Sequence, residues 1–281
     1  MKTLQMLEIR LDRACISVWV LLLCHTVLAQ DMKNHFLTPK NGSTYVIAHR
    51  GAHHHAPENS LLAYRNAIKM GCDFVEIDLR KTKDGKFVSV HNQTVDAYFE
   101  DKTGKVKDFT LAELKQVPLA GNNLGLETQY IPTFEEILEL CKGKIGIYLD
   151  LKEPDIKNQV QIIEEYGMER DIVWYIPASD HEAIERLKMY CGECFVMPDP
   201  GKEKNLLPVL QKIQPKIIAT DMGHLSASFV DTSHRNGAKV FVDDSEATET
   251  EWSHIINIGT DGIQTDRPEK LIQFLKKEDK N

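Results

Sequence analysis

The chain has 281 residues, 42% of them hydrophobic and 27% charged, which is enough for one large domain with a buried core. Its 42 acidic residues outnumber its 34 basic residues and give a formal net charge of -8. This balance argues against nucleic acid as a partner, because a phosphate backbone needs a basic binding face. It is compatible with a small anionic substrate, whose charge a few local cations can neutralise.

The N-terminus has the pattern of an export signal. Two arginines precede the apolar run 14–29, which ends in Val27-Leu28-Ala29, a sequence typical of a cleavage site. The alternative is a membrane anchor, but the run is short for a spanning helix. We therefore predict that residues 1–29 are a signal peptide and that residues 30–281 form one domain. The mature protein is expected to be periplasmic or secreted, without stable membrane insertion.

Four cysteines follow the predicted signal: Cys72, Cys141, Cys191 and Cys194. In an oxidising compartment they allow three pairings, among which the sequence does not choose. Cys191 and Cys194 form a Cys-x-x-Cys motif, which is compatible with a local disulfide or with half of a zinc site. Because a zinc site normally needs a second such pair, we favour a structural role.

Short β-rich runs alternate with amphipathic segments along the rest of the chain. The nine candidate strands are 45–49, 73–79, 87–91, 145–151, 171–175, 194–197, 216–220, 239–243 and 261–265. The candidate helices include 60–70, 133–141, 155–166, 179–190, 225–236 and 247–258. Repeated strand–helix order predicts a parallel sheet, and roughly eight such units predict its closure as an α/β fold of the TIM-type (β/α)8 barrel class.

Two segments depart from this repeat. The connection 79–87 is too short for a helical crossover, so we expect a hairpin around Asp84-Gly85 or a return without a helix. One of the nine strands is therefore surplus to an eight-stranded barrel. Residues 92–131 have weak periodicity and several glycines, and we predict that they form a small excursion on the barrel rim.

Two of the predicted strands end in histidine. The first runs into His49-Arg50, and the third ends at His91. Parallel barrels carry their chemistry at the carboxyl ends of the strands, where imidazoles can transfer protons and a guanidinium can bind phosphate. A single histidine at a strand end is more commonly a structural or surface residue. The prediction therefore depends on the convergence of several such groups at one rim.

Two other strands carry pairs of charged residues. Glu76 and Asp78 lie on the second strand, and Asp150 and Lys152 lie at the end of the fourth; each pair shares one face. Buried carboxylates are costly unless they pair or bind a metal, and oxygen ligands suit magnesium or calcium rather than zinc. We predict that the three carboxylates hold one Ca²⁺ or Mg²⁺ ion and that Lys152 binds phosphate. The alternatives are a simple salt bridge on the second strand and a Lys152 that only neutralises Asp150 or Glu153.

These residues belong to motifs that resemble the glycerophosphodiester phosphodiesterase family. The motifs are HRG (49–51), PENS (57–60), GCDFVEIDLRKTKDGKFVSVH (71–91), LDLK (149–152) and GTDGIQTDRP (259–268). The resemblance is densest between residues 46 and 91. It implies a TIM barrel, one divalent cation, and hydrolysis of small-molecule glycerophosphodiesters to glycerol 3-phosphate and an alcohol.

The resemblance also implies roles for individual residues. His49 and His91 match the acid–base pair of the family, and Arg50 matches its phosphate contact. Glu58 and Asn59 match the PEN element, which we expect to brace the loop after the first strand. The implied mechanism is attack on phosphorus by the glycerol 2-hydroxyl or by water. One imidazole removes the attacking proton and the other protonates the leaving alkoxide.

The metal ligands match with one departure. Glu76 and Asp78 occupy the first two ligand positions, and Lys152 occupies the position of the family's lysine. Asp150 stands where the family usually has glutamate, one methylene longer. We therefore expect the ion to lie closer to that strand, or to reach Asp150 through water.

Four further positions leave alternatives open. Asn92 stands where aspartate is usual, and Thr265-Asp266 could form a structural hydrogen bond or contact the substrate. The run His53-His54-His55 is interpreted as a solvated loop rather than a metal site. The acidic pair in FVDD (241–244) could favour a cationic leaving group, or belong to a solvated loop. The competing functions are hydrolysis of a different lipid phosphodiester and a catalytically silent phosphate-binding module.

Overall fold

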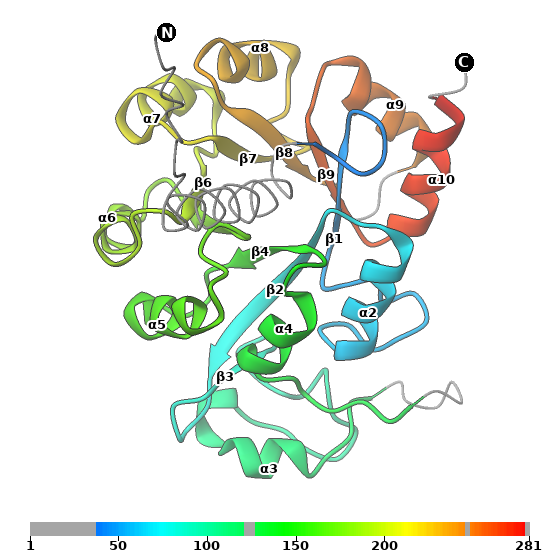
Figure 1. The fold of residues 1–281 in the computed structure, drawn as a ribbon, viewed down its shortest axis with the longest axis vertical. Coiled ribbons are helices and arrows are strands. Elements are labelled where there is room, and N and C mark those ends of the chain that lie inside the picture. The colour runs from blue at the N-terminus through cyan, green and yellow to red at the C-terminus, as the bar shows by residue number, and fades with distance from the viewer. Residues whose placement is uncertain (1–37, 121–126, 245–247, 279–281) are drawn as a thin grey trace, which may run out of the picture.

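The protein is a nearly closed barrel of eight parallel strands surrounded by helices (Figure 1). The computed structural model describes residues 38–120, 127–244 and 248–278. The strands are β1 Tyr45–Ala48, β2 Phe74–Lys81, β3 Phe87–Ser89, β4 Gly146–Asp150, β5 Ile172–Pro177, β6 Phe195–Asp199, β7 Ile217–Asp221, β8 Lys239–Asp243 and β9 Gly262–Thr265. Parallel pairing joins them in the order β6-β5-β4-β2-β1-β9-β8-β7, and β6 and β7 lie next to each other at the two ends of this order.

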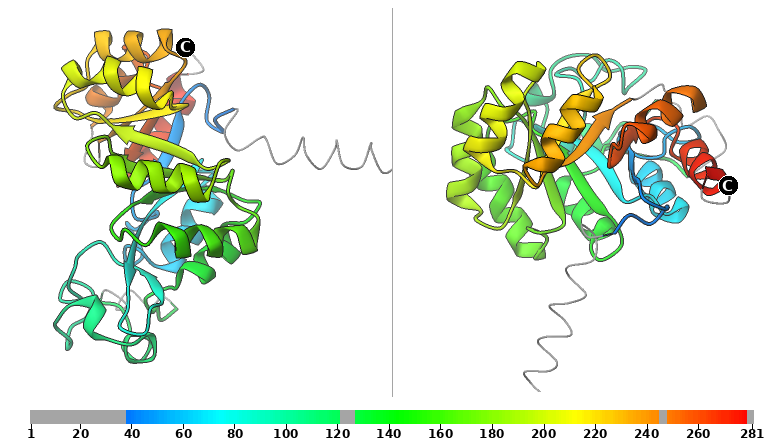
Figure 2. Two further views of the ribbon diagram at one scale, coloured as in Figure 1. Left: turned by 90° about the vertical axis from the view of Figure 1, so that its left-hand side faces the viewer. Right: turned by 90° about the horizontal axis from the view of Figure 1, so that it is seen from above.

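The helices follow the strands around the outside of the barrel (Figures 1 and 2). They are α2 Leu61–Met70, α3 Leu111–Lys115, α4 Phe134–Cys141, α5 Ile156–Tyr166, α6 His181–Tyr190, α7 Leu206–Ile213, α8 Ala227–Arg235, α9 Glu249–Asn257 and α10 Pro268–Glu278. Short 3-10 turns, η1 Val106–Asp108 and η3 Glu203–Asn205, complete the described elements. Ser60, Thr133 and Thr248 cap their helices by accepting backbone N–H groups, as their residue types predict.

The predicted fold is confirmed, and the structure identifies the surplus strand. All nine predicted strands are present, and β3 is the additional one because it pairs antiparallel with β2. The connection between them is a hairpin at Asp84-Gly85, one of the two expected forms. Helices α7 and α10 were not among those expected. Each has a proline in its first turn, Pro208 in α7 and Pro268 in α10. At these positions a backbone N–H would have no acceptor within the helix, so proline is tolerated.

Aromatic rings fill the barrel interior beneath the rim. Tyr45, Phe74 and Phe241 pack together, with ring centroids 5.4 to 6.1 Å apart. Two glycines make this packing possible, because a Cβ on Gly146 or Gly262 would lie 2.5 Å from a carbon of the Phe74 or Phe241 ring. Beneath the rim, the interior is therefore a packed core.

Gly146→Ala is expected to destabilise the barrel without touching the rim. The added methyl group would overlap Phe74, and overpacking of this kind costs about 1–3 kcal/mol of unfolding free energy. Urea denaturation would measure the loss. Gly192→Ala is the matched control, because its Cβ would have no atom within 4 Å. Equal stabilities of the two variants would contradict this account of the core.

The predicted excursion lies between β3 and α4. Its described part includes η1 and α3, and it encloses a small hydrophobic cluster of its own that includes Val95, Tyr98 and Leu114. In the left view of Figure 2 it extends beyond the barrel at the bottom. The excursion is therefore a separately packed unit attached beside the rim.

The four cysteines after the predicted signal form one disulfide and two free thiols. Cys191 and Cys194 form a local disulfide, whereas Cys72 and Cys141 are buried and free. The disulfide accounts for the Cys-x-x-Cys motif, so its two sulfurs are not zinc ligands here. The predicted signal peptide, residues 1–29, lies outside the described residues. Within the described ranges, no helix has both the length and the apolar character needed to cross a membrane.

Candidate active site

A cavity of about 420 Å³ opens at the carboxyl ends of the barrel strands. Its lining residues are His49, Arg50, Glu76, His91, Tyr148, Asp150, Lys152, Tyr175, Asp199, Thr220, Asp221, Asp243 and Gln264. The lining contains every predicted catalytic, metal-binding and phosphate-binding residue except Asp78, which is fully buried. The strand ends thus bring these residues to one place, as the barrel geometry requires.

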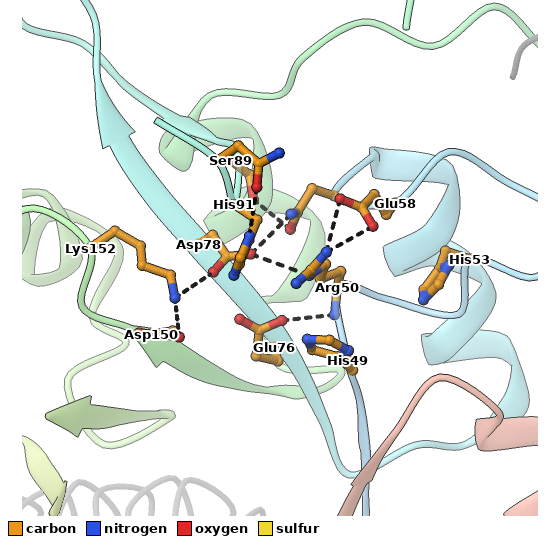
Figure 3. A network of polar contacts seen from close by, with 12 residues as sticks. His49, Arg50, His53, Glu58, Glu76, Asp78, Ser89, His91, Asp150 and Lys152 are labelled. Carbon is orange, nitrogen blue, oxygen red and sulfur yellow. Dashed lines mark hydrogen bonds and ion pairs between the residues drawn. The ribbon is translucent and has the colours of Figure 1, made fainter. Parts of the chain in front are cut away.

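Three carboxylates form a compact cluster at one side of this cavity (Figure 3). Glu76, Asp78 and Asp150 each offer an oxygen, and these oxygens lie within 4.8 Å of one another. The strands explain the cluster, because Asp78 and Asp150 are register partners on β2 and β4 and Glu76 lies two residues earlier on the same face.

The environment of these carboxylates favours a nearby cation. Burial raises the pKa of Glu76 well above its ordinary value, and the charges of Asp78 and Asp150 raise it further. Burial also raises the pKa of Asp150. One oxygen of Asp78, Oδ1, is buried without a hydrogen-bond partner. All the donors are oxygens, so the cluster fits a hard divalent cation.

Lys152 contacts this cluster directly. Its Nζ lies 2.5 Å from Asp150 Oδ2 and 3.4 Å from Asp78 Oδ1. Burial opposes the charge of the lysine, but the attraction of these carboxylates outweighs it and raises the pKa of Lys152. This contact corresponds to the alternative in which Lys152 neutralises Asp150. The ammonium nevertheless lines the cavity, where it can also face an anion.

A tight turn after β1 positions Arg50. The residue adopts a left-handed conformation with φ of 51°, and its backbone N–H donates a hydrogen bond of 2.8 Å to Glu76 Oε2. Gly51 follows with φ of 81°, and a Cβ there would lie 2.8 Å from the Cβ of Ala63 on α2. The glycine of the HRG motif therefore allows the turn to lie close to α2. Through the Arg50 N–H, the same turn holds Glu76, a predicted metal ligand.

A chain of hydrogen bonds joins Arg50 to His91 through the rim excursion. Glu58 accepts from Arg50 Nη1 at 3.0 Å and from the Tyr98 hydroxyl at 2.8 Å. Tyr98 in turn accepts from the backbone N–H of His91 at 3.0 Å. Sequence reasoning missed Tyr98, because the excursion has no regular pattern from which to place its side chains.

Asn59 connects the same loop to the carboxylate cluster. Its Nδ2 donates to Asp78 Oδ2 at 3.0 Å, and its Oδ1 accepts from the hydroxyls of Tyr64 at 2.9 Å and Ser89 at 3.0 Å. These bonds fix the amide, which then fixes one oxygen of Asp78. The PEN element therefore lies where it can brace both Arg50 and a predicted metal ligand.

Asp266, in the loop after β9, joins two histidines. Its Oδ1 accepts from His49 Nδ1 at 2.7 Å and from His53 Nε2 at 3.1 Å. Burial opposes ionisation of Asp266, but the hydrogen bonds from these imidazoles outweigh it and lower the pKa of the carboxyl. Of the two open roles for Asp266, the structure shows a hydrogen bond within the protein.

The interpretation of the triple histidine as a solvated loop is wrong for His53 and holds for His54 and His55. His53 is partly buried and bonded to Asp266, whereas the other two are exposed. Local sequence could not separate the three histidines, because the partner of His53 lies 213 residues away.

His91 is fixed in a similar way to His49. Its Nδ1 lies 2.9 Å from Asn92 Oδ1, which as a carbonyl oxygen can only accept. Its backbone carbonyl accepts two bonds from Arg80, at 3.0 Å from Nε and 2.6 Å from Nη2. In both histidines Nδ1 is engaged by an acceptor, which leaves Nε2 as the nitrogen that can act on a ligand in the cavity.

The fold and this site together define a barrel enzyme that places three clustered carboxylates, two imidazoles and two cationic side chains around one cavity. Residues 49–193 match the sequence profile of the Glycerophosphoryl diester phosphodiesterase family. A glycerophosphodiester phosphodiesterase from Caldanaerobacter subterraneus subsp. tengcongensis is 32% identical over 255 residues, which cover 83% of this chain and 98% of the relative. The chain belongs to the glycerophosphodiester phosphodiesterase family, as its motifs predicted, and is an enzyme of that class.

Solved structures have the same fold. A glycerophosphodiester phosphodiesterase from Agrobacterium tumefaciens superposes with a TM-score of 0.74 at 24% identity, covering 82% of this chain and 99% of the other. A phosphodiesterase from Oleispira antarctica, determined in complex with the product sn-glycerol-3-phosphate, superposes with a TM-score of 0.72 at 23% identity. The latter match covers 83% of this chain and 96% of the other. At these identities the likeness supports the TIM barrel.

Proposed function

We propose that this enzyme hydrolyses glycerophosphodiesters, the deacylated forms of phospholipids, to glycerol 3-phosphate and an alcohol. The observation that carries the proposal is the convergence of carboxylates, imidazoles and cationic side chains on one cavity of about 420 Å³. The product bound to the Oleispira antarctica relative is consistent with glycerol 3-phosphate as one product here.

Glu76, Asp78 and Asp150 would hold one divalent cation, Ca²⁺ or Mg²⁺. Their clustered oxygens and the burial of Glu76 and Asp78 support this choice of ligands. When bound, such an ion supplies positive charge to the phosphate and helps to align the attacking oxygen. Asp150 is the register partner of Asp78, and with its shorter side chain the ion would lie closer to β4 or reach Asp150 through water.

Arg50 and Lys152 would bind the phosphate oxygens. Glu58 holds one end of the Arg50 guanidinium, while Nε is buried without a hydrogen-bond partner and lies 3.8 Å from Asp78 Oδ2. A buried donor of this kind is costly unless a ligand satisfies it. A phosphate beside the carboxylate cluster would do so, and Lys152 lies on the other side of the same cluster.

His49 and His91 would move the protons. One imidazole takes the proton of the attacking hydroxyl, either the glycerol 2-hydroxyl or water, and the other gives a proton to the departing alkoxide. Asp266 and Asn92 hold the two rings through Nδ1, so that each presents Nε2. Positioned proton transfer of this kind typically contributes about 10²–10⁴-fold to the rate.

We also propose that the enzyme is exported. The apolar run and cleavage pattern of residues 1–29 support this. The Cys191–Cys194 disulfide supports it independently, because disulfides persist mainly in oxidising compartments.

The test is the release of glycerol 3-phosphate from glycerophosphocholine by protein stripped with EDTA. Calcium, magnesium or zinc is then added back separately. We expect release that depends on calcium or magnesium, because the ligands are all oxygens. A folded protein that releases nothing with any of the ions would contradict the proposal and favour a silent binding module or another phosphodiester.

A further inference from the structure

A second cavity, of about 260 Å³, adjoins the catalytic one and is lined mainly by cationic side chains. Its lining residues are Arg80, Lys81, Gln93, Lys105, Val106, Lys107, Lys152 and Glu153. Five of these eight residues are cationic and one is acidic, on a chain whose net charge is -8. Lys152 lines both cavities, so they meet at that residue. We call the second cavity the basic pocket.

Three segments of the chain build the basic pocket. Arg80 and Lys81 are the last two residues of β2, and Lys152 follows β4, the neighbour of β2. Lys105 and Lys107 belong to the rim excursion, the first capping η1 and the second lying within it. Because η1 packs against β2, the excursion brings its two lysines to the cations at the strand ends. The pocket therefore depends on the excursion and not on the barrel alone.

Arg80 supplies a guanidinium that is held in place. Its side chain is only 13% exposed, and its Nε and Nη2 donate to the His91 carbonyl at 3.0 and 2.6 Å. Its third nitrogen, Nη1, lies 3.8 Å from Glu153 Oε1, which is beyond hydrogen-bond distance. One face of a fixed guanidinium is thus available to an anion in the pocket.

The two lysines of the excursion have no counterion of their own. Both are exposed, and neither forms an ion pair with a described residue. By contrast, Lys81 Nζ lies 2.5 Å from Asp155 Oδ2, and Lys152 is paired within the carboxylate cluster. Like charges gathered around one hollow repel each other and focus a positive potential into it, so a bound anion would stabilise the arrangement.

The positive charge is confined to the pocket. From residue 92 to residue 120 the excursion has five acidic residues and four lysines, so its surface as a whole is not basic. A membrane or a nucleic acid needs an extended basic face, whereas a small concave pocket suits a compact anion. A phosphate monoester fits best, because it concentrates about two negative charges on oxygens that arginine and lysine bind well.

We propose that the basic pocket is a second anion site, separate from the catalytic cavity, that binds a phosphate monoester. Two sources share this chemistry. One is free phosphate, and the other is a phosphate group on the leaving alcohol of a glycerophosphodiester held in the adjoining cavity. The second source alone rests on the proposed function.

The first test is the binding of inorganic phosphate to the full chain, measured by calorimetry at low salt after removal of metal ions and chelator. Lys105→Gln with Lys107→Gln is compared with Lys202→Gln and Lys204→Gln, a matched control. The control lysines are exposed, remove the same charge and hold the same positions on η3. The catalytic cavity contributes equally in each protein, because none of these four lysines lines it.

We expect two phosphate-binding events, one of which the pocket variant weakens about tenfold, because each lost cation removes one ion pair. That event should also weaken as salt is added. Equal phosphate binding by the two double variants would overturn the proposal. Binding to phosphatidylglycerol vesicles that depends on Lys105 and Lys107, with no change in phosphate binding, would show a membrane contact instead and would also overturn it.

The second test identifies the source of the phosphate. Turnover of glycerophosphoinositol is compared with that of glycerophosphoinositol 4-phosphate. A lower KM for the phosphorylated ester, lost in the pocket variant, assigns the phosphate to the substrate. Equal KM values, with the phosphate binding of the first test present, assign the pocket to free phosphate. If neither ester is hydrolysed, the proposed function fails, while the first test still decides this inference.

Discussion

Glu76→Gln is expected to abolish divalent-cation binding and, with it, phosphodiesterase activity. The amide has almost the same shape, so the hydrogen bond from the Arg50 N–H can remain while the ligand charge is lost. Loss even of outer-shell partners costs about 10–100-fold in metal affinity, so a direct ligand should cost at least about 100-fold. Calorimetric titration with Ca²⁺ and Mg²⁺ would measure the affinity, and glycerol 3-phosphate release would measure activity.

The same variant should have a second, opposite effect on the ion-free protein. Glu76 is buried, and both its burial and the neighbouring carboxylates raise its pKa, so its charge opposes folding. We expect ion-free Glu76→Gln to unfold at or above the temperature of the unmodified protein, and added Ca²⁺ to stabilise only the latter. Glu139→Gln on the exposed surface of α4 is the matched control. Undiminished ion affinity in Glu76→Gln would refute the ligand role.

The carboxylate cluster was predictable because it follows from strand periodicity together with the parallel order of the strands. Glu76 and Asp78 share a face of β2, and the parallel order places β4 beside β2, so Asp150 arrives in register with Asp78. The same logic delivered His49 to the rim. These side chains could be placed because the sequence indicates where each strand ends and that the strands are parallel.

The partner of His49 was not predictable from local pattern. Asp266 lies 217 residues away, and the two meet only because β9 closes the barrel against β1. The register pairs Thr265 with Ala48, so the residues that follow each strand are neighbours. Both polar residues were visible in the sequence, in Thr265-Asp266 and His49-Arg50. Pairing them required knowing that the first and last strands of the barrel are neighbours.

Three aspartates of the cavity lining left a different signal unused. Asp199, Asp221 and Asp243 end β6, β7 and β8, but the predicted strands 194–197 and 216–220 stopped short of the first two. Only Asp243 drew attention, because the other two lie in no motif of the resemblance. Tyr98 had no signal of this kind, since its position depends on how the irregular excursion packs against the rim.

His49→Ala should abolish turnover while cation binding survives. The imidazole is not one of the three carboxylates proposed to hold the cation. Removal of a positioned acid–base group typically costs about 10²–10⁴-fold in kcat. Asp266→Asn tests the positioning of the same ring, because the carboxylate accepts from His49 Nδ1 at 2.7 Å. An amide can present its N–H instead and turn the ring to the wrong tautomer, so kcat should fall while KM changes little.

The pH profile separates this positioning role from a structural one. Hydrogen bonds from His49 and His53 lower the pKa of Asp266, so the carboxylate stays ionised throughout a neutral assay range and does not itself produce the pH dependence. In Asp266→Asn kcat should therefore be lower by the same factor across the whole of this pH range, because the change removes a positioning contact and not an ionisation. His55→Ala, an exposed change in the same loop, is the control and should leave kcat, KM and the profile unchanged. Near-native turnover by His49→Ala, or a rise in KM alone for Asp266→Asn, would show that proton transfer is carried by other groups.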